Sequence, residues 1–504
     1  MIESNIGGTP EGTAPTTPQQ WIDWLYSKLG RRRAQYRAYG EYYDGIHQRL
    51  MFSQGRHFDQ FHRTFESWRD NFCGLIVDSV NERLAVDGFR MTDEPDADTD
   101  ARDIWQRNAM DAESNAAMLD AMIQGVSYAV VWADAKGQPT ITMESAENLI
   151  VQYTPGSRRQ LDAAAKFYTD DWGREWVTLW LPDQVWTFAK GTFAWDQGTS
   201  APNPLGVVPV VPLSNRSRLL RDPVSDLHVV IPIQDAINKT VADALVASEY
   251  AAWPQRYVTG LEIVEDSHGN PVEPFKIAVD KLLQAEDPQA KFGQFEAADL
   301  GNYVTLIEML VQHMASISRI PFHYFLNGGT VPSGESITAA EAGLIAKTRE
   351  RMLHFGEAWE EAMRLCFRVL GDSRSDAYSA ETIWRDPENR TESQHMDALL
   401  KLQMIGVPRD QLLSDAGYTP QQIARFQDMR EADAKAAMEL AQKYPMPVQD
   451  PIAGQNPVEA TPTTAGGSAT PPNAGSPTPA AKKAASKPPQ GNSGNQARKQ
   501  TPAK

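Results

Sequence analysis

Residues 317–344 read ISRIPFHYFLNGGTVPSGESITAAEAGL, and the organisation of the chain turns on this stretch. Within it, Gly329 and Gly334 are separated by four residues, and Glu335 and Ser336 follow directly. That is the glycine spacing of a phosphate-binding loop, but a carboxylate stands where such a loop needs a lysine for the β- and γ-phosphates. The residues before it read as a helix end with a proline and not as a buried strand. The local pattern therefore predicts a glycine-rich turn between two helices.

Long helices are predicted on both sides of this turn. Upstream, apolar residues alternate in steps of three and four, the narrow seam that helix–helix packing uses. The seam consists of Val304, Ile307, Val311, Met314 and Ile317. Downstream, a helix is predicted to reach about Leu370, a length of roughly 50 Å at 1.5 Å per residue. Its apolar face consists of Thr348, Met352, Phe355, Trp359, Met363 and Phe367.

The first part of the chain is expected to begin with a disordered segment and to continue with helices. Residues 1–19 are expected to be disordered, and a short helix opens at Trp21. Amphipathic spacing predicts further helices over 68–84 and 101–124, the second closed by Gly125 as a C-cap.

Short β patterns follow, separated by Gly, Pro and Asp, and they predict an antiparallel meander. They are 126–134, 139–144, 164–170, 175–181, 184–189 and 191–196. A proline-broken connector over 203–215 leads to a predicted helix over 228–252. The net-negative segment 253–298 contains β-like pieces, and 391–443 reads as a compact helical module. The combination indicates an α+β protein.

Composition limits the classes of function. The chain has 504 residues and a formal net charge of −17, which argues against tight non-specific DNA binding. The two cysteines, Cys73 and Cys366, lie in apolar helical contexts and are expected to be core thiols of a reducing compartment. No run of about 18 apolar residues occurs, so no transmembrane helix is expected. The N-terminus lacks the features of a signal peptide, and a cytosolic protein is expected.

No catalytic, cofactor or metal site is predicted. His57 and His62 lack supporting ligands at metal-site spacing, so packing or surface roles are favoured for both. Asp235 and Asp243 fall off the apolar stripe of their helix, and a solvated face is the simpler interpretation when that helix is taken alone. The aromatic cluster Trp172, Trp176, Trp180, Trp186 and Trp195 could form a stacking surface, but core and interface roles are commoner on strands.

Three segments resemble portal proteins of tailed double-stranded DNA phages, in particular siphophages of actinobacteria. Residues 68–90, WRDNFCGLIVDSVNERLAVDGFR, are similar to an early wing segment of these proteins. Residues 115–134 resemble the helix and strand that follow it, and 317–344 resemble the tunnel-loop region. The ordered combination of segments, over roughly residues 20–440, carries the resemblance, because no single motif is as specific as a zinc-ligand set.

The resemblance implies a portal fold: an α/β wing, a helical stem, a small β-containing clip, a tunnel loop followed by a long helix, and a helical crown. The implied domains are a disordered N-terminus 1–19, the wing 20–225, a stem helix 226–252, the clip 253–298, a second stem helix 299–320, the tunnel loop 321–336, the long wing helix and return 337–390, the crown 391–443 and a disordered tail 444–504.

The resemblance also implies a function and partners. Twelve copies would form a ring at one capsid vertex of the virion, assembled in the host cytoplasm, through which the genome is packaged and ejected. The implied partners are the terminase large subunit, head–tail connector or adaptor proteins, the major capsid and scaffold proteins, and transient non-specific contact with double-stranded DNA. No membrane and no cofactor is implied.

Specific residues receive roles from this architecture. The seam 304–317 would pack stem helices within one subunit or between neighbours, and Asp235, Asp243 and Glu249 are candidate lumen acids. The DNA-facing tunnel loop would comprise Asn327, Gly328, Gly329, Thr330, Val331, Pro332, Ser333, Gly334, Glu335 and Ser336. Two alternatives remain open: a nucleotide-dependent packaging enzyme that uses the glycine loop, and another minor capsid or scaffold protein.

Overall fold

The computed structural model describes part of the chain, and its helices and antiparallel strands confirm the predicted α+β class. The described residues are 13–46, 70–91, 97–191, 195–196, 198–219, 221–252, 256–260, 267–268, 288–294, 299–325, 334–388, 392–418 and 420–443. The chain divides into two compact units, Met1–Thr391 and Glu392–Lys504, each of which is considered by itself.

The first helix, α1, spans Pro18–Tyr43 and is longer than the short helix that the sequence predicts. A capping box starts it: the Thr17 hydroxyl accepts from the backbone of Gln20, whose side chain accepts from the Thr17 backbone. The expected disorder up to residue 19 is therefore wrong for residues 17–19, because these two polar side chains satisfy the first backbone donors of the helix.

The predicted helix 101–124 is two helices, α4 (Thr99–Arg107) and α5 (Met110–Gln124). Ala109 between them adopts a left-handed φ of 53°. The Asn108 side chain donates to the Ile104 carbonyl and accepts from the backbone of Ile141, so it replaces helical hydrogen bonds at the break. Gly125 caps α5 with a φ of 98°, as predicted.

The strands form two main sheets and not one meander. Strands β4 (Leu149–Tyr153), β5 (Leu161–Thr169), β6 (Glu175–Trp180), β7 (Gln184–Ala189) and β8 (Thr199–Pro202) form a five-stranded antiparallel meander. Strands β2 (Val126–Ala133) and β3 (Pro139–Ser145) pair instead with β9 (Val210–Ser214), in the order β3-β2-β9. The connector predicted over 203–215 thus contains a strand, since β2 offers it a free edge that local sequence cannot reveal. Of the predicted piece 191–196, residues 192–194 lie outside the described residues.

A short sheet joins distant parts of the first unit. Strand β1 (Val86–Arg90), which follows helix α3 (Phe72–Asn81), pairs antiparallel with β12 (Glu381–Trp384). Between them in sequence lies α8 (Gly334–Leu370), whose predicted apolar face is buried in the main core. There the rings of Trp359 and Trp105 meet edge to face at 5.3 Å. The cysteines Cys73 and Cys366 are buried free thiols, as predicted.

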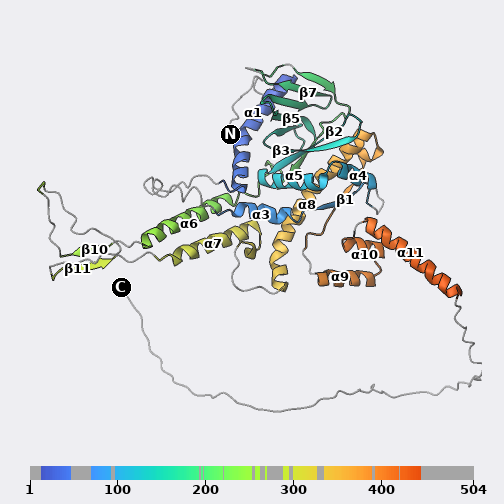
Figure 1. The fold of residues 1–504 in the computed structure, drawn as a ribbon. Helices are drawn as coiled ribbons and strands as arrows, with labels where there is room; N and C mark the ends of the chain where they lie inside the picture. Colours follow the sequence, from blue (N-terminus) through green and yellow to red (C-terminus); the bar gives the residue numbers. More distant parts are fainter. Residues whose placement is uncertain are drawn as a thin grey trace, which may run out of the picture. The chain divides into compact units, whose positions relative to one another are not determined.

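Two helices form a pair that carries a small sheet. Helices α6 (Ile231–Ala252) and α7 (Gly301–Ser318) pack side by side, and β10 (Arg256–Thr259) pairs antiparallel with β11 (Lys291–Gln294) at their ends (Figure 1). A short 3-10 turn, η1 (Phe322–Tyr324), follows α7, and a second, η2 (Ser373–Asp376), follows α8. Pro232 lies in the first turn of α6, where its missing N–H costs nothing.

The described residues of the second unit form three helices, as predicted for 391–443. They are α9 (Glu392–Met404), α10 (Arg409–Asp415) and α11 (Pro420–Lys443). Pro420 is the first helical residue of α11, a position that suits proline. No helix within the described parts of either unit has the length and apolar character needed to cross a membrane.

Candidate functional site

The glycine-rich loop is the candidate site that the sequence singled out. Residues 326–333 lie outside the described residues, so most of the predicted loop positions, Asn327, Gly328, Gly329, Thr330, Val331, Pro332 and Ser333, are not placed. Gly334, Glu335 and Ser336 form the start of α8. The predicted boundary of the loop at residue 336 is therefore late by three residues.

A buried polar group holds the chain where it enters the loop. The Tyr324 hydroxyl donates to Glu341 of α8 at 3.1 Å and accepts from Arg83, just after α3, at 2.9 Å. Arg83 and Glu341 also form a buried ion pair at 3.5 Å. Next to it, the rings of Phe325 and Phe72 pack at 5.5 Å. The loop thus leaves from a position fixed to α3 and α8.

The end of α7 has an unusual backbone. Arg319 adopts a left-handed φ of 60° and donates its backbone N–H to the Ala315 carbonyl, which ends the helix. An open, mostly apolar groove of about 590 Å³ lies beside this cap. Its lining includes Ile320, Phe322 and Gly343, so the groove lies between the end of α7 and the first half of α8.

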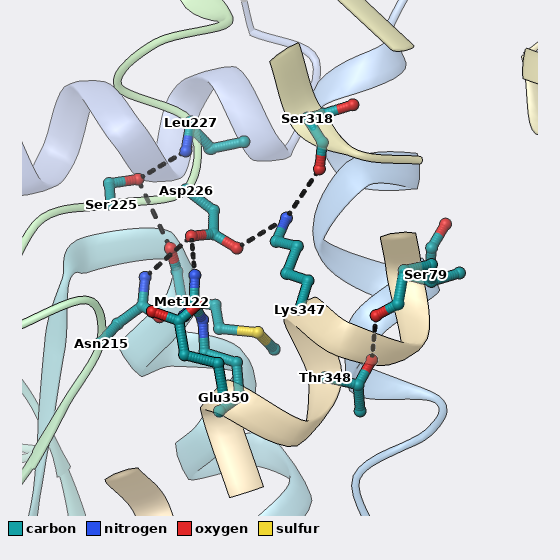
Figure 2. Close-up of polar contacts among 12 residues, drawn as sticks. Ser79, Met122, Asn215, Ser225, Asp226, Leu227, Ser318, Lys347, Thr348 and Glu350 are labelled. Carbon is teal, nitrogen blue, oxygen red and sulfur yellow. Dashed lines mark hydrogen bonds and ion pairs between the residues drawn. The ribbon is translucent and has the colours of Figure 1, made fainter. Parts of the chain in front are cut away.

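A buried charge cluster fixes the bases of α6 and α7 to α8 (Figure 2). Asp226, just before α6, accepts from Arg351 at 2.9 Å and from Asn215 at 3.1 Å through Oδ1. Its Oδ2 lies 3.0 Å from the Lys347 ammonium, which also donates to the carbonyl of Ser318 at the end of α7. One point on α8 thus binds both the start of α6 and the end of α7.

In the buried part of this cluster, one carboxylate faces two cations, and a second carboxylate lies only at its edge. Burial alone would raise the pKa of Asp226, but the charges of Lys347 and Arg351 hold it well below its usual range. Burial lowers the pKa of Lys347, and the attraction of Asp226 offsets this only in part. Arg351 finds a further acidic neighbour in Glu350, whose carboxylate lies 3.5 Å away at the edge of the cluster.

The three candidate lumen acids lie in different environments. Asp235 is half-buried and accepts a hydrogen bond of 2.8 Å from Tyr42 of α1, so it belongs to the packing between α1 and α6. Asp243 forms an ion pair with Lys239 one turn earlier on α6. Glu249 is exposed near the end of α6. The structure therefore leaves Glu249 as the acid on an open surface.

The predicted apolar seam of α7 is divided between the subunit and its surface. Val311 and Met314 are fully buried, and Ile307 packs at the edge of the same core. Val304 and Ile317 are exposed, and so are Leu306 and Met309, which the sequence did not single out. Only part of the apolar surface of α7 is thus used within one subunit.

The other residues that the sequence singled out are only partly placed by the structure. His57 and His62 lie outside the described residues. Within the described ranges, no group of three or more His, Cys, Asp or Glu side chains could hold a metal ion. Of the five tryptophans, Trp180 is buried and Trp186 and Trp195 pack at the core of the five-stranded sheet, as favoured, whereas Trp172 is exposed.

The sequence interpretation missed Asp226, Lys347 and Arg351. A signal was present: Lys347 and Arg351 flank Thr348 and Met352 on the face of α8 that is otherwise apolar. A cation on such a face is rarely buried without a carboxylate partner. The partner, 125 residues away from Arg351, could not be identified from this pattern.

Comparisons with known proteins identify the family. The family described as "Phage portal protein, SPP1 Gp6-like" matches residues 22–436. The portal protein of Mycobacterium phage L5 is 32% identical over 417 residues, which cover 77% of this chain and 83% of that protein. The portal protein of Mycobacterium phage D29 is 33% identical over 413 residues, covering 76% and 82%. The chain therefore belongs to the phage portal proteins, a family of structural proteins and not of enzymes.

Proposed function

We propose that twelve copies of this chain form a ring at one vertex of the capsid, through which DNA enters during packaging and leaves during ejection. The ring assembles in the host cytoplasm and remains in the virion. The family match over residues 22–436 carries this proposal. In this assignment α6 and α7 form the stem, 253–298 the clip, 326–333 the tunnel loop and the second unit the crown.

The exposed apolar residues of α7 support assembly into a ring. Leu306 and Met309 are exposed on the side of α7 opposite the buried Val311 and Met314, and Val304 and Ile317 are exposed at the two ends of the apolar seam. Apolar residues gathered on one helix mark an interaction surface. A head-to-tail contact between different surfaces of identical subunits generates a closed ring when the rotation closes.

The charge of the chain supports a channel that releases DNA. Each phosphate that a lysine or arginine neutralises strengthens binding by releasing counterions. The net charge is −17, and residues 321–336, which include the tunnel loop and the start of α8, contain Glu335 and no lysine or arginine. We assign Glu335 and Glu249 to the channel wall, with Asp243 contributing less because Lys239 pairs with it. Asp235, which bonds to Tyr42, is no longer among the candidates.

The clip is the proposed docking site for other machinery. Strands β10 and β11 form a two-stranded sheet at the ends of the stem helices, separate from the sheets of the main core. We propose that this region binds the terminase large subunit during packaging and the head–tail connector proteins afterwards.

A phage that lacks the gene for this chain tests the function. It is expected to yield shells without DNA, and expression of the chain in trans is expected to restore filled heads. Filled heads without the chain would contradict the proposal. ATP hydrolysis by the purified chain that disappears when Gly329 and Gly334 are replaced would instead favour a packaging enzyme. If shells made without this chain lack a defined vertex opening but still fill with DNA, this would favour a role of the chain as another minor capsid or scaffold protein.

A further inference from the structure

Arginines gather at one surface of the first unit, beside α1. Arg158, in the turn between β4 and β5, donates to the Ser217 hydroxyl and to the Arg218 carbonyl, each at 3.1 Å, so this turn lies against the segment between β9 and α6. Arg32 of α1 forms an ion pair with Asp222 of the same segment at 2.6 Å. The arginine surface thus defined consists of Arg32, Arg158, Arg159, Arg216, Arg218 and Arg221.

Most of these arginines have no carboxylate to compensate them. Arg159, Arg216, Arg218 and Arg221 are exposed, and none of the four forms an ion pair with any part of the chain that the structure describes. Arg218 and Arg221 lie opposite each other across a tight turn, where the Arg221 N–H donates to the Arg218 carbonyl at 3.4 Å. Like charges placed directly opposite each other are destabilising. The arginine surface therefore favours contact with an anionic partner.

Carboxylates gather at another surface of the same unit, around Arg374 of η2. Arg374 forms ion pairs with Asp98, Asp100 and Asp372 at 2.9, 2.8 and 2.8 Å, so three carboxylates share one guanidinium. Asp103, about one turn after Asp100 on α4, is exposed and forms no ion pair within the described ranges. The acidic surface consists of Asp98, Asp100, Asp103, Asp372 and Asp376, against the cations Arg374 and Arg368.

The two surfaces lie on opposite sides of the first unit. The arginine surface lies beside α1, and the acidic surface is formed by α4 and η2. Helix α5 packs against both α1 and α4, and Figure 1 shows these two helices on either side of it. The arginines and the carboxylates therefore cannot compensate each other within one subunit.

A second copy of the chain fits both surfaces at once. In a head-to-tail contact, one side of a subunit meets the opposite side of the next subunit. The arginine surface would then face the acidic surface, and a single kind of contact would compensate both. DNA would compensate the arginine surface alone and leave the acidic surface without cations. Charge complementarity on two opposite sides therefore favours a second copy over DNA.

We propose that the arginine surface of each subunit binds the acidic surface of the next subunit and so sets the direction in which subunits join. This rests on the proposed ring, and it adds a polar contact to the apolar side of α7. Two subunits that meet through the same surface would place like charges together, and such a juxtaposition is strongly disfavoured. The contact thus selects head-to-tail pairs, which can close into a ring, over symmetric pairs, which cannot extend.

Charge reversal of one surface at a time tests this. The arginine-surface variant is Arg218→Glu with Arg221→Glu, and the acidic-surface variant is Asp103→Lys with Asp376→Lys. Each purified full-length variant is expected to keep the circular dichroism spectrum of the wild type and to form at least about tenfold fewer rings. Rings are counted by size-exclusion chromatography with light scattering at about 100 mM salt. The control is Lys136→Glu, which reverses an exposed cation at the β2–β3 turn, outside both surfaces, and should assemble like the wild type.

A mixture of the two variants gives the sharper result. The arginine-surface variant is acidic on both sides and the acidic-surface variant is basic on both sides, so neither suits a copy of itself. An equimolar mixture is expected to form rings in which the two alternate, because every contact then joins opposite charges. A chain that carries all four substitutions is expected to form rings alone, since both surfaces are reversed together.

Three results would overturn the proposal. One is rings of either variant alone at the yield of the wild type. Another is an equimolar mixture that assembles no better than its components. The third is an arginine-surface variant that assembles normally but loses binding to a labelled duplex, which would make DNA the partner of the arginines. Each of these leaves the proposed function standing, whereas a wild-type chain that stays monomeric would contradict the ring and this contact together.

Discussion

Asp226 is a single buried carboxylate that forms ion pairs with two buried cations, Lys347 and Arg351. It accepts hydrogen bonds from Arg351 and Asn215, and it forms an ion pair with Lys347 inside the junction of α6, α7 and α8 (Figure 2). Removing one partner of a buried ion pair leaves an uncompensated charge and costs far more than the pair contributes to stability. The arrangement therefore predicts unequal effects for mutations at its members.

Asp226→Asn is expected to destabilise the protein by about 3–5 kcal/mol, because it leaves the buried Lys347 without a carboxylate and Arg351 with Glu350 alone, at the edge of the cluster. Lys347→Met is expected to change the free energy of unfolding by less than about 1 kcal/mol, since it relieves the excess positive charge and keeps the Asp226–Arg351 pair. Urea denaturation followed by circular dichroism measures both. Equal losses for the two variants would show that the imbalance of charge has no energetic consequence.

The same carboxylate predicts a dependence of stability on pH. The pKa of Asp226 is lower in the folded protein than the unfolded value of about 3.9, so its contribution is fully present above that value and is lost as pH falls below it. Urea midpoints are therefore expected to fall more steeply below about pH 4 for the wild type than for Asp226→Asn. Parallel profiles would contradict this.

At the scale of elements, the helices with long periodic patterns were predictable and the strand pairings were not. The spacing of apolar residues located α6, α7 and α8, because burial of one face follows from local sequence. The pairing of β9 with β2 and of β1 with β12 joins segments far apart in the chain, and no local pattern records it. The break at Asn108 depends likewise on a bond to Ile141 of the neighbouring strand.

The tunnel loop allows a prediction about charge. Glu335→Lys is expected to make assembled rings retain DNA at low salt, because it adds one phosphate-binding cation per subunit near the loop. Retention of a labelled duplex is measured by filter binding at about 50 and 200 mM salt, and it should fall steeply between the two. Glu335→Gln is the control without the added cation and should retain little. Weak, salt-independent retention by Glu335→Lys would place residue 335 away from the path of DNA.

At the scale of the whole molecule, the exposed apolar side of α7 makes the isolated subunit incomplete. Met309→Arg is expected to leave the fold of the subunit intact, because the side chain is exposed in the subunit. It should nevertheless shift the protein from rings to monomers, since it places a charge in an apolar interface. Size-exclusion chromatography with light scattering measures the change. Asn302→Arg adds the same charge in the first turn of α7 and should leave rings intact.

The C-terminal segment is expected to play no part in assembly. Residues 445–504 lie outside the described residues, and their composition of Pro, Ala, Gly, Thr and Ser offers few residues that could form a core. Truncation after Tyr444 is therefore expected to leave ring assembly and the melting temperature of the rings unchanged. Loss of rings in the truncated chain would refute this.

Electron microscopy of the purified full-length chain tests the central claim most directly. Negatively stained particles are expected to show rings with a central hole and twelvefold symmetry, and light scattering should give a mass of about twelve times the 55.9 kDa of one chain. Particles that remain monomeric at every concentration, or that close into shells without a central hole, would contradict the assignment of this chain as the ring-forming channel of the capsid.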